Sequence, residues 1–293
     1  MATPAQWIEG ARLRTLPMAL APVVAGSAAA QALHSFEPVR ALLALLVALL
    51  LQVGVNYAND YSDGIRGTDD DRVGPLRLTG SGAAAPGRVK AAALLCFGLA
   101  ALAGALLVVL SRQWWFVPVG LSAVLAAWGY TGGRSPYGYR GLGDVFVFVY
   151  FGLVAVLGTT LTQAGTLNLE ALVASLSTGL IATALLMANN IRDLPGDREV
   201  GKRTLAVRLG DPLARVVFTA EIAVAFALVL FLVPHNPWML LVLLLLPAAW
   251  APVATVLRVQ DRRRLIPVLR QCGVLNVGWA VLFLLAVLLR QWA

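Results

Sequence analysis

The chain has 293 residues, of which 59% are apolar and only 13% are charged, and its formal net charge is +8. A soluble domain is about half apolar and about a quarter charged, because it must cover its surface with charge. This composition excludes an ordinary soluble fold and indicates that a bilayer solvates most of the surface. The basic residues lie in short segments between apolar runs. That placement is typical of membrane insertion and argues against nucleic-acid binding.

Apolar runs of roughly 20 residues mark membrane spans, because about 30 Å of hydrocarbon needs that many helical residues. We expect one all-α integral-membrane domain over residues 1–293, a bundle of about nine transmembrane helices near 15–33, 39–61, 91–110, 114–131, 145–167, 170–191, 213–233, 237–257 and 271–290. The first run imitates a signal peptide, with Arg12 and Arg14 before it and small residues at its end. Because Pro17 and Pro22 interrupt this run, we expect it to remain as a membrane helix.

Nine spans place alternate connections on opposite sides of the membrane. All but three of the 23 Lys and Arg residues then fall on one side, the exceptions being Arg40, Arg112 and Arg290. The positive-inside rule puts that side, with the N-terminus, in the cytoplasm and the C-terminus outside. We therefore expect a bacterial cytoplasmic-membrane protein whose polar chemistry faces the cytoplasm. The two longest connections on this side, 62–88 and 192–212, are dense in Asp, Arg and Gly.

Two of the predicted spans end in the same pattern, Asn-x-x-x-Asp. It occurs at Asn59/Asp63 and at Asn189/Asp193, and Asp197 follows one helical turn later. Residues three or four apart share one face of a helix. Because the two spans are four helices apart, both patterns reach the cytoplasmic side, where they can face each other.

Carboxylates in this position are costly, at roughly 2.5–3.5 kcal/mol each near the bilayer centre and less toward the interface. Something cationic must compensate them. Oxygen ligands without His or Cys favour Mg²⁺ or Ca²⁺ over Zn²⁺. Since Mg²⁺ uses one or two carboxylates and completes its shell with phosphate, the pattern predicts a diphosphate site. The run Asp69–Asp71 fits either this site or a set of solvated loop acids.

Basic residues accompany the acids. Arg192 lies within the second pattern, Lys202 and Arg203 follow it, and another cytoplasmic connection carries Tyr130 and Arg134. Lys and Arg clamps on phosphoryl oxygens stabilise a leaving diphosphate. Taken singly, each basic residue is better explained by the positive-inside rule.

These motifs resemble the UbiA-type superfamily of intramembrane prenyltransferases, and the likeness spans essentially the whole chain. The motifs that carry it are Asn59-Asp60-x-x-Asp63, Tyr130-x-x-x-Arg134 and Asp193-x-x-x-Asp197. Within the superfamily, segments 14–17, 59–63, 71–75, 130–133 and 189–193 resemble the 1,4-dihydroxy-2-naphthoate polyprenyltransferases of menaquinone synthesis, in their actinobacterial form.

The resemblance implies a reaction and a set of site residues. A polyprenyl group would pass from its diphosphate to 1,4-dihydroxy-2-naphthoate, with loss of CO₂ and diphosphate, while the isoprenoid tail runs between helices into lipid. Two Mg²⁺ ions are implied, with the ligands Asn59, Asp63, Asp193 and Asp197. We expect Asp60 and Tyr130 to be catalytic, and the expected substrate and diphosphate contacts are Arg14, Arg134, Asn189, Asn190, Arg192 and Lys202. Arg14 is assigned to the carboxylate of the acceptor.

This chain also departs from the superfamily pattern. Many members have a third Asp where this chain has Gly67, so Asp60 or the run Asp69–Asp71 takes that place. Arg134 stands where the superfamily has Lys, which keeps the charge but changes the geometry. The aromatic residues Tyr57, Tyr61 and Trp128 fit either packing or cation–π stabilisation of an allylic cation.

Two other functions stay open at the level of sequence. A sibling enzyme would use another acceptor, such as 4-hydroxybenzoate or haem. An ion-coupled transporter would carry acids near mid-bilayer, accessible from both faces. Because clustered carboxylates repel one another, we also expect Asp63→Asn and Asp193→Asn to leave folding unchanged or slightly improved. Glu221, inside a predicted span, has no assigned role.

Overall fold

The structure is a computed structural model that describes residues 2–67, 76–133 and 135–292. The described residues form helices joined by turns, and no β-strand occurs among them. The prediction of an all-α membrane protein is therefore confirmed. The predicted site residue Arg134 and the run Asp69–Asp71 lie outside the described residues.

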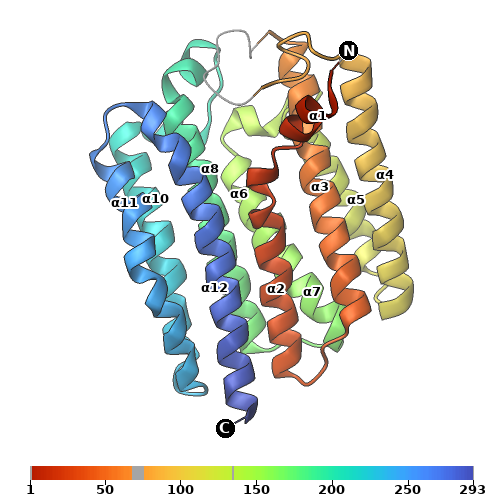
Figure 1. Cartoon of the computed structure of the whole chain (residues 1–293), viewed down its shortest axis with the longest axis vertical. Helices are drawn as coiled ribbons and strands as arrows, with labels where there is room; N and C mark the ends of the chain where they lie inside the picture. The colour runs from red at the N-terminus through yellow and green to blue at the C-terminus, as the bar shows by residue number, and fades with distance from the viewer. Residues whose placement is uncertain (1, 68–75, 134, 293) are drawn as a thin grey trace.

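The first half of the chain builds one side of the bundle and part of its centre (Figure 1). Its elements are α1 (Pro4–Gly10), η1 (Leu13–Thr15), α2 (Pro17–Ala32), α3 (Pro38–Gly64), α4 (Pro86–Ser111), α5 (Phe116–Gly129), η2 (Tyr137–Arg140), α6 (Gly143–Val147), η3 (Phe148–Val154) and α7 (Ala155–Ala164). Proline at the first position starts several of these helices, since its missing N–H has no helical partner there in any case. Pro22 lies inside α2, which continues through it.

The second half completes the bundle. Its elements are α8 (Leu169–Glu199), α9 (Leu205–Leu209), α10 (Asp211–Ala227), η4 (Leu228–Phe231), η5 (Pro237–Leu245), α11 (Leu246–Arg258), η6 (Arg262–Leu265) and α12 (Ile266–Trp292). The α10 and α11 helices lie on the side of the bundle opposite α4 and α5, with α2 and α12 side by side between them (Figure 1).

Each of the nine predicted spans is helical, but their number is not settled by length. Seven helical segments in the described ranges are long and apolar enough to cross a membrane. They become eight if the pair Pro4–Thr15 and Pro17–Ala32, bent by 48°, is one span. A further apolar helix, α5, has 14 residues and is shorter than these segments. The two chain ends lie at opposite ends of the bundle, as an odd number of crossings requires (Figure 1). Nine spans and their orientation stay predictions.

The α8 helix is the centre of the bundle. Within its apolar window 72% of the residues are buried, the largest share among the candidate spans. Glycines let α8 and η3 pack closely against each other, because a Cβ atom on Gly179 of α8 would lie only 3.0 Å from the Cα atom of Gly152 in η3. Large side chains instead cover the outer helices, where Leu95, Leu102 and Leu121 are exposed. An apolar face exposed in this way is what a lipid-facing helix presents.

The α8 helix also runs further than its apolar sequence predicts. We expected the span to end near residue 191, but the helix continues to Glu199 and passes through Pro195. Proline removes the hydrogen bond to the carbonyl four residues earlier, which is that of Ile191. The Arg262 guanidinium donates to this carbonyl instead. A side chain from η6 thus replaces the lost backbone bond, and the extra turns carry Asp193 and Asp197.

The predicted topology can be tested by labelling. In a chain whose native cysteines, Cys96 and Cys272, are replaced by alanine, we expect the single variants Arg263→Cys and Pro237→Cys to react with an impermeant maleimide from opposite sides of the membrane. Both positions are exposed: Pro237 begins η5, and Arg263 lies in η6, just after the end of α11. Labelling of Arg263→Cys from the cytoplasmic side alone supports the N-in orientation, and labelling of both from one side would refute the map.

Candidate active site

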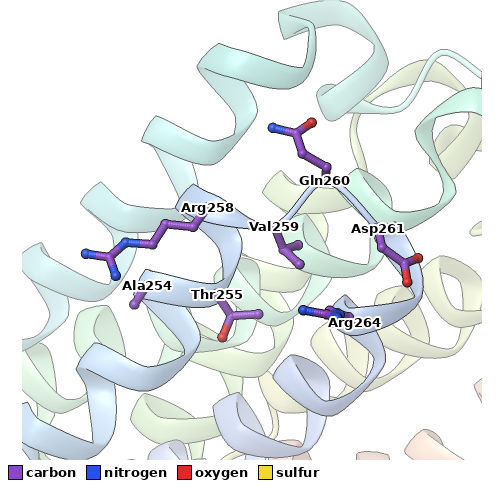
Figure 2. Close-up of a pocket in the computed structure, with 7 residues that line it drawn as sticks. All are labelled: Ala254, Thr255, Arg258, Val259, Gln260, Asp261 and Arg264. Atoms are coloured by element: carbon purple, nitrogen blue, oxygen red, sulfur yellow. The ribbon is translucent and has the colours of Figure 1, made fainter.

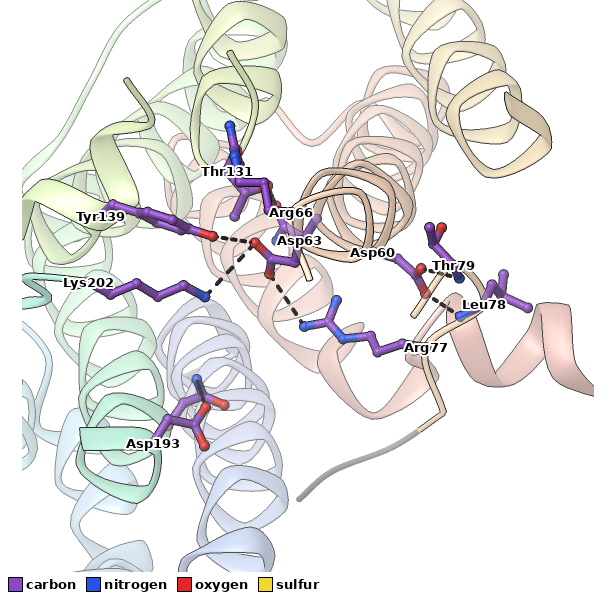
Figure 3. A network of polar contacts seen from close by, with 12 residues as sticks. Asp60, Asp63, Arg66, Arg77, Leu78, Thr79, Thr131, Tyr139, Asp193 and Lys202 are labelled. Atoms are coloured by element: carbon purple, nitrogen blue, oxygen red, sulfur yellow. Dashed lines mark hydrogen bonds and ion pairs between the residues drawn. The ribbon is translucent and has the colours of Figure 1, made fainter. Parts of the chain in front are cut away.

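Asp63 is the residue around which the polar end of the bundle is arranged. It lies in the last turn of α3 and is 3% exposed. Its Oδ1 atom accepts a hydrogen bond of 2.7 Å from the Tyr139 hydroxyl and lies 3.9 Å from Lys202 Nζ. Its Oδ2 atom lies 3.8 Å from Arg77 Nη2. Figure 3 shows these three side chains converging on Asp63 from different segments of the chain.

Asp60, one turn earlier, has a different environment. It is fully buried, and its two oxygens accept hydrogen bonds from the backbone amides of Leu78 (2.7 Å) and Thr79 (2.8 Å). Bonds from N–H donors to a carboxylate are stronger than bonds between neutral groups. Asp60 therefore holds the start of the segment after residue 75 against α3 (Figure 3). The same anchorage places the neighbouring Arg77 beside Asp63.

Asn59 ties α3 to the segment that follows α5. Its Oδ1 atom accepts a hydrogen bond of 2.7 Å from the Thr131 hydroxyl, and both residues are buried. Arg66 reaches the same segment, because its guanidinium donates to the carbonyls of Thr131 and Gly133. The Asn59 side chain thus lies at the polar end of α3, as the sequence predicts, and its carbonyl oxygen accepts the Thr131 hydrogen bond.

The second predicted pattern forms a compact cluster on the extended part of α8. Arg192 makes a paired contact with Asp193, with both nitrogen–oxygen distances at 2.7 Å. Arg192 Nη2 also donates to Asn189 Oδ1 over 2.8 Å, and Asn189 Nδ2 donates to Asp193 over 3.4 Å. Asp197 is half-buried one turn further, and Asn190 is buried on the same helix. The predicted sharing of one helix face by Asn189 and Asp193 is confirmed by their direct contact.

Two loops that are distant in the sequence join to place Lys202. The backbone amide of Arg203 donates to the carbonyl of Tyr139 over 2.9 Å. The Arg208 side chain donates to the carbonyl of Arg140 over 2.7 Å. Gly141 has a φ angle of +74°, and an added Cβ atom would lie 2.7 Å from Arg208 Nε, so this position needs glycine. Lys202 Nζ then lies 4.6 Å from the centre of the Tyr139 ring, within cation–π range.

Tyr130 takes part in a group of aromatic rings. Its ring makes an edge contact with Tyr137 at 5.6 Å, and Tyr137 stacks on Phe146 at 3.9 Å. Burial raises the pKa of the Tyr137 hydroxyl, which donates to the carbonyl of Ala126. The tyrosine whose hydroxyl donates to Asp63 is Tyr139, which the sequence analysis did not single out.

The predicted acceptor contact, Arg14, is exposed in η1. Arg12 lies at the bend between α1 and α2 with a left-handed backbone (φ 53°), and its Nε and Nη2 atoms are buried. Asn56 of α3 holds this bend by donating to the carbonyl of Ala11 and to the Thr15 hydroxyl. Non-glycine residues in this backbone conformation are uncommon and cluster at functional sites.

The expectation that the acid clusters mainly repel one another is wrong for the described residues. Asp63 is faced by Arg77 and Lys202, and Asp193 is paired with Arg192. Among residues 2–67, 76–133 and 135–292, no three acidic, His or Cys side chains lie close enough to hold a metal ion by themselves. Removing the charge of Asp63 or Asp193 therefore removes an attraction, and we expect a small loss of stability instead of a gain.

Residues 19–271 match the model of the UbiA prenyltransferase family. The chain belongs to this family. It is 50% identical over 281 residues to the 1,4-dihydroxy-2-naphthoate octaprenyltransferase of Mycobacterium tuberculosis, covering 96% of both chains. It is 38% identical over 296 residues to the protein of the same name from Escherichia coli, covering 98% of this chain and 96% of that one.

The fold agrees with this assignment. The solved structure of a UbiA homolog from Archaeoglobus fulgidus bound to DMAPP and Mg²⁺ aligns with a TM-score of 0.67, covering 96% of this chain and 99% of that chain at 14% identity. The resemblance to the superfamily that was inferred from the motifs is confirmed.

The anchoring contact of Asp60 gives a stability prediction. In Asp60→Asn only one of the two side-chain atoms can accept, so one backbone amide loses its partner in a buried position. We expect a loss of about 1–3 kcal/mol in the free energy of unfolding, seen as a lower melting temperature in detergent.

Glu9→Gln is the matched control. Glu9 Oε1 accepts from the backbone amide of Leu76 over 3.1 Å, in the same segment but in an exposed position, and glutamine keeps an acceptor there. We expect little change in melting temperature for this variant. Equal melting temperatures for Asp60→Asn and the unsubstituted protein would contradict the proposed anchoring of residues 78 and 79 by Asp60.

Proposed function

We propose that the chain transfers a polyprenyl group from a polyprenyl diphosphate to 1,4-dihydroxy-2-naphthoate, with loss of CO₂ and diphosphate, in menaquinone biosynthesis. The observation that carries this proposal is the 50% identity, over 96% of both chains, to a relative named for octaprenyl transfer to this acceptor. The geometry is in keeping with it, because acids and cations gather at one end of a membrane bundle. A transporter with its acids near mid-bilayer would not be built in this way.

Magnesium is the cofactor that the donor chemistry favours. The polar ends of α3 and α8 offer oxygen donors, chiefly carboxylates and amides, which are hard ligands. Mg²⁺ needs only one or two protein carboxylates when a phosphate completes its shell, so the described residues fit it without a cluster of three acids. Asn59 and Asp63 would hold one ion, and Asp193 and Asp197 a second. The Archaeoglobus fulgidus homolog was solved with Mg²⁺ and DMAPP, which supports Mg²⁺ as the metal of this fold.

The cations of the site would contact the diphosphate. Lys202, Arg77 and Arg192 already lie beside the carboxylates, where a bound diphosphate would meet them. Fixed positive charges at the place where negative charge develops stabilise the departing diphosphate as the allylic C–O bond breaks. When bound, Mg²⁺ adds Lewis-acid stabilisation of the same oxygens. Tyr139 holds Asp63 in place through its hydroxyl.

Asp60 acts in this proposal as a positioning residue, because both of its oxygens are occupied by backbone amides. It sets the segment from which Arg77 reaches Asp63. Tyr130, with its ring in the aromatic group beside Tyr137, would line the substrate side of the site. The rings of Tyr61 and Trp128 lie 6.1 Å apart, with Lys90 over both, and this cation makes them poor candidates for stabilising an allylic cation.

The membrane setting follows from the distribution of charge. Nearly all Lys and Arg residues lie on the side of the site. The positive-inside rule therefore supports an orientation with the site toward the cytoplasm. The bacterial relatives support a bacterial cytoplasmic membrane as its location.

An acceptor screen tests the proposed function. Purified protein is incubated with Mg²⁺, a polyprenyl diphosphate and, in separate reactions, 1,4-dihydroxy-2-naphthoate or 4-hydroxybenzoate, and the lipid-soluble products are identified by mass. We expect product from the naphthoate only, none in excess chelator, and recovery when Mg²⁺ is restored. Product from 4-hydroxybenzoate alone would contradict the acceptor, and full turnover in chelator would contradict the metal.

The fixed position of Arg12, at the left-handed bend that Asn56 holds, supports it in place of the exposed Arg14 as the residue that contacts the carboxylate of the acceptor. We expect Arg12→Gln to raise the KM for 1,4-dihydroxy-2-naphthoate at least about tenfold, equivalent to about 1.4 kcal/mol, with the KM for the prenyl diphosphate unchanged. The control Arg14→Gln, two residues away, should change either KM less than about twofold. A raised KM for the naphthoate in Arg14→Gln but not in Arg12→Gln would assign the carboxylate contact to Arg14.

A further inference from the structure

A groove of about 550 Å³ lies between the end of α11 and η6 (Figure 2). Two arginines line it, Arg258 from the last turn of α11 and Arg264 from η6, together with Thr255, Gln260 and Asp261. In the view of Figure 2, Thr255 lies between the two arginines. The groove is separate from the Asp63 site, because none of its lining residues takes part in that network.

The two arginines of the groove differ from the nearby Arg215 and Arg262, whose guanidinium groups are engaged. Arg215 donates to the carbonyls of Val256 and Val259 and pairs with Asp211, and Arg262 bonds to Asp211 and to the carbonyl of Ile191. Arg258 and Arg264 are exposed, and within the described part of the chain their guanidinium groups have no hydrogen-bond or ion-pair partner. The one acid of the groove, Asp261, accepts from the backbone amide of Arg263 over 3.1 Å. The groove thus keeps a net positive charge.

An exposed apolar stripe leads to the groove. Leu246 and Trp250 of α11 are 48% and 59% exposed, and Ala254 and Arg258 follow them at intervals of four residues, which places all four on one helix face. The candidate span that contains them ends at Arg258. An apolar stripe that ends in unpaired guanidinium groups matches an acyl chain below a phosphate head group.

We propose that this groove binds the head group of an anionic phospholipid, with its phosphate between Arg258 and Arg264 and its acyl chains along α11. The charge of the groove is what selects this ligand. In a head group without net charge, the phosphate is already neutralised by the cationic group of the same lipid, so the two arginines gain less from binding it.

Lipid binding at the groove would also stabilise part of the active site. Arg262, in the same turn as Arg264, supplies the hydrogen bond that the Ile191 carbonyl loses to Pro195. Ile191 directly precedes Arg192 and Asp193. A lipid that holds η6 in place would therefore support the part of α8 that carries these residues.

Lipid binding is measured by native mass spectrometry of the full chain in detergent, titrated with phosphatidylglycerol or with phosphatidylcholine. We expect one phosphatidylglycerol to bind more tightly than the rest, and the double variant Arg258→Gln/Arg264→Gln to weaken this binding at least about tenfold. Arg263→Gln removes one positive charge, against two in the double variant, from the turn that also carries Arg264, and it does not touch the groove. It should change the affinity less than about twofold. The double variant should keep its prenyl transfer in detergent, which shows that it is folded.

Three results would overturn the proposal. The first is equal binding of phosphatidylcholine and phosphatidylglycerol to the unsubstituted protein. The second is unchanged phosphatidylglycerol affinity in the double variant. The third is a loss in Arg263→Gln as large as in the double variant, which would reduce the effect to the overall charge of this membrane face.

Discussion

A carboxylate buried at the end of a membrane helix must be compensated, since its transfer out of water costs several kcal/mol. For Asp63 the compensation comes from three places in the chain: Arg77 after α3, Tyr139 in η2, and Lys202 after α8. One side chain therefore draws together three loops that the bundle alone would leave independent. Backbone contacts of this end, such as the bond between the Arg203 amide and the Tyr139 carbonyl, hold the same loops together.

The α8 helix shows how the bundle extends its polar chemistry beyond the apolar core. Its central part is packed by small residues against several helices, while its last turns rely on a side chain from η6. The helix can therefore carry Arg192 and Asp193 past Pro195 in a fixed orientation. The two acid sites are supported by different contacts. Near Asp63, the Asp60 carboxylate accepts from two backbone amides. Near Asp193, the Arg262 guanidinium donates to the Ile191 carbonyl.

Much of this arrangement was predictable from the sequence, because long apolar runs and residues three or four apart have direct structural meaning. The helix positions and the shared face of Asn189 and Asp193 follow from that periodicity. The roles of Asp60 and Tyr139 did not, because each depends on a partner far away in the chain: the backbone of Leu78 and Thr79 for one, and Asp63 for the other. The pairing of Asp63 and Asp193 with basic side chains was also not predicted. The sequence alone does not distinguish a basic loop residue that marks topology from one that pairs with an acid.

The central claim is that Asp63 on α3 and Asp193 on α8 serve one diphosphate together, and a double-mutant comparison of kcat tests it most directly. Asp63→Asn, Asp193→Asn and the double variant are assayed as folded, monodisperse protein at saturating Mg²⁺ and substrates. We expect each single variant to lose at least about a hundredfold in kcat, equivalent to about 2.7 kcal/mol of barrier, and the double variant to be little slower than the slower single variant. Losses that multiply in the double variant, or single variants that turn over at the original rate, would contradict a shared site.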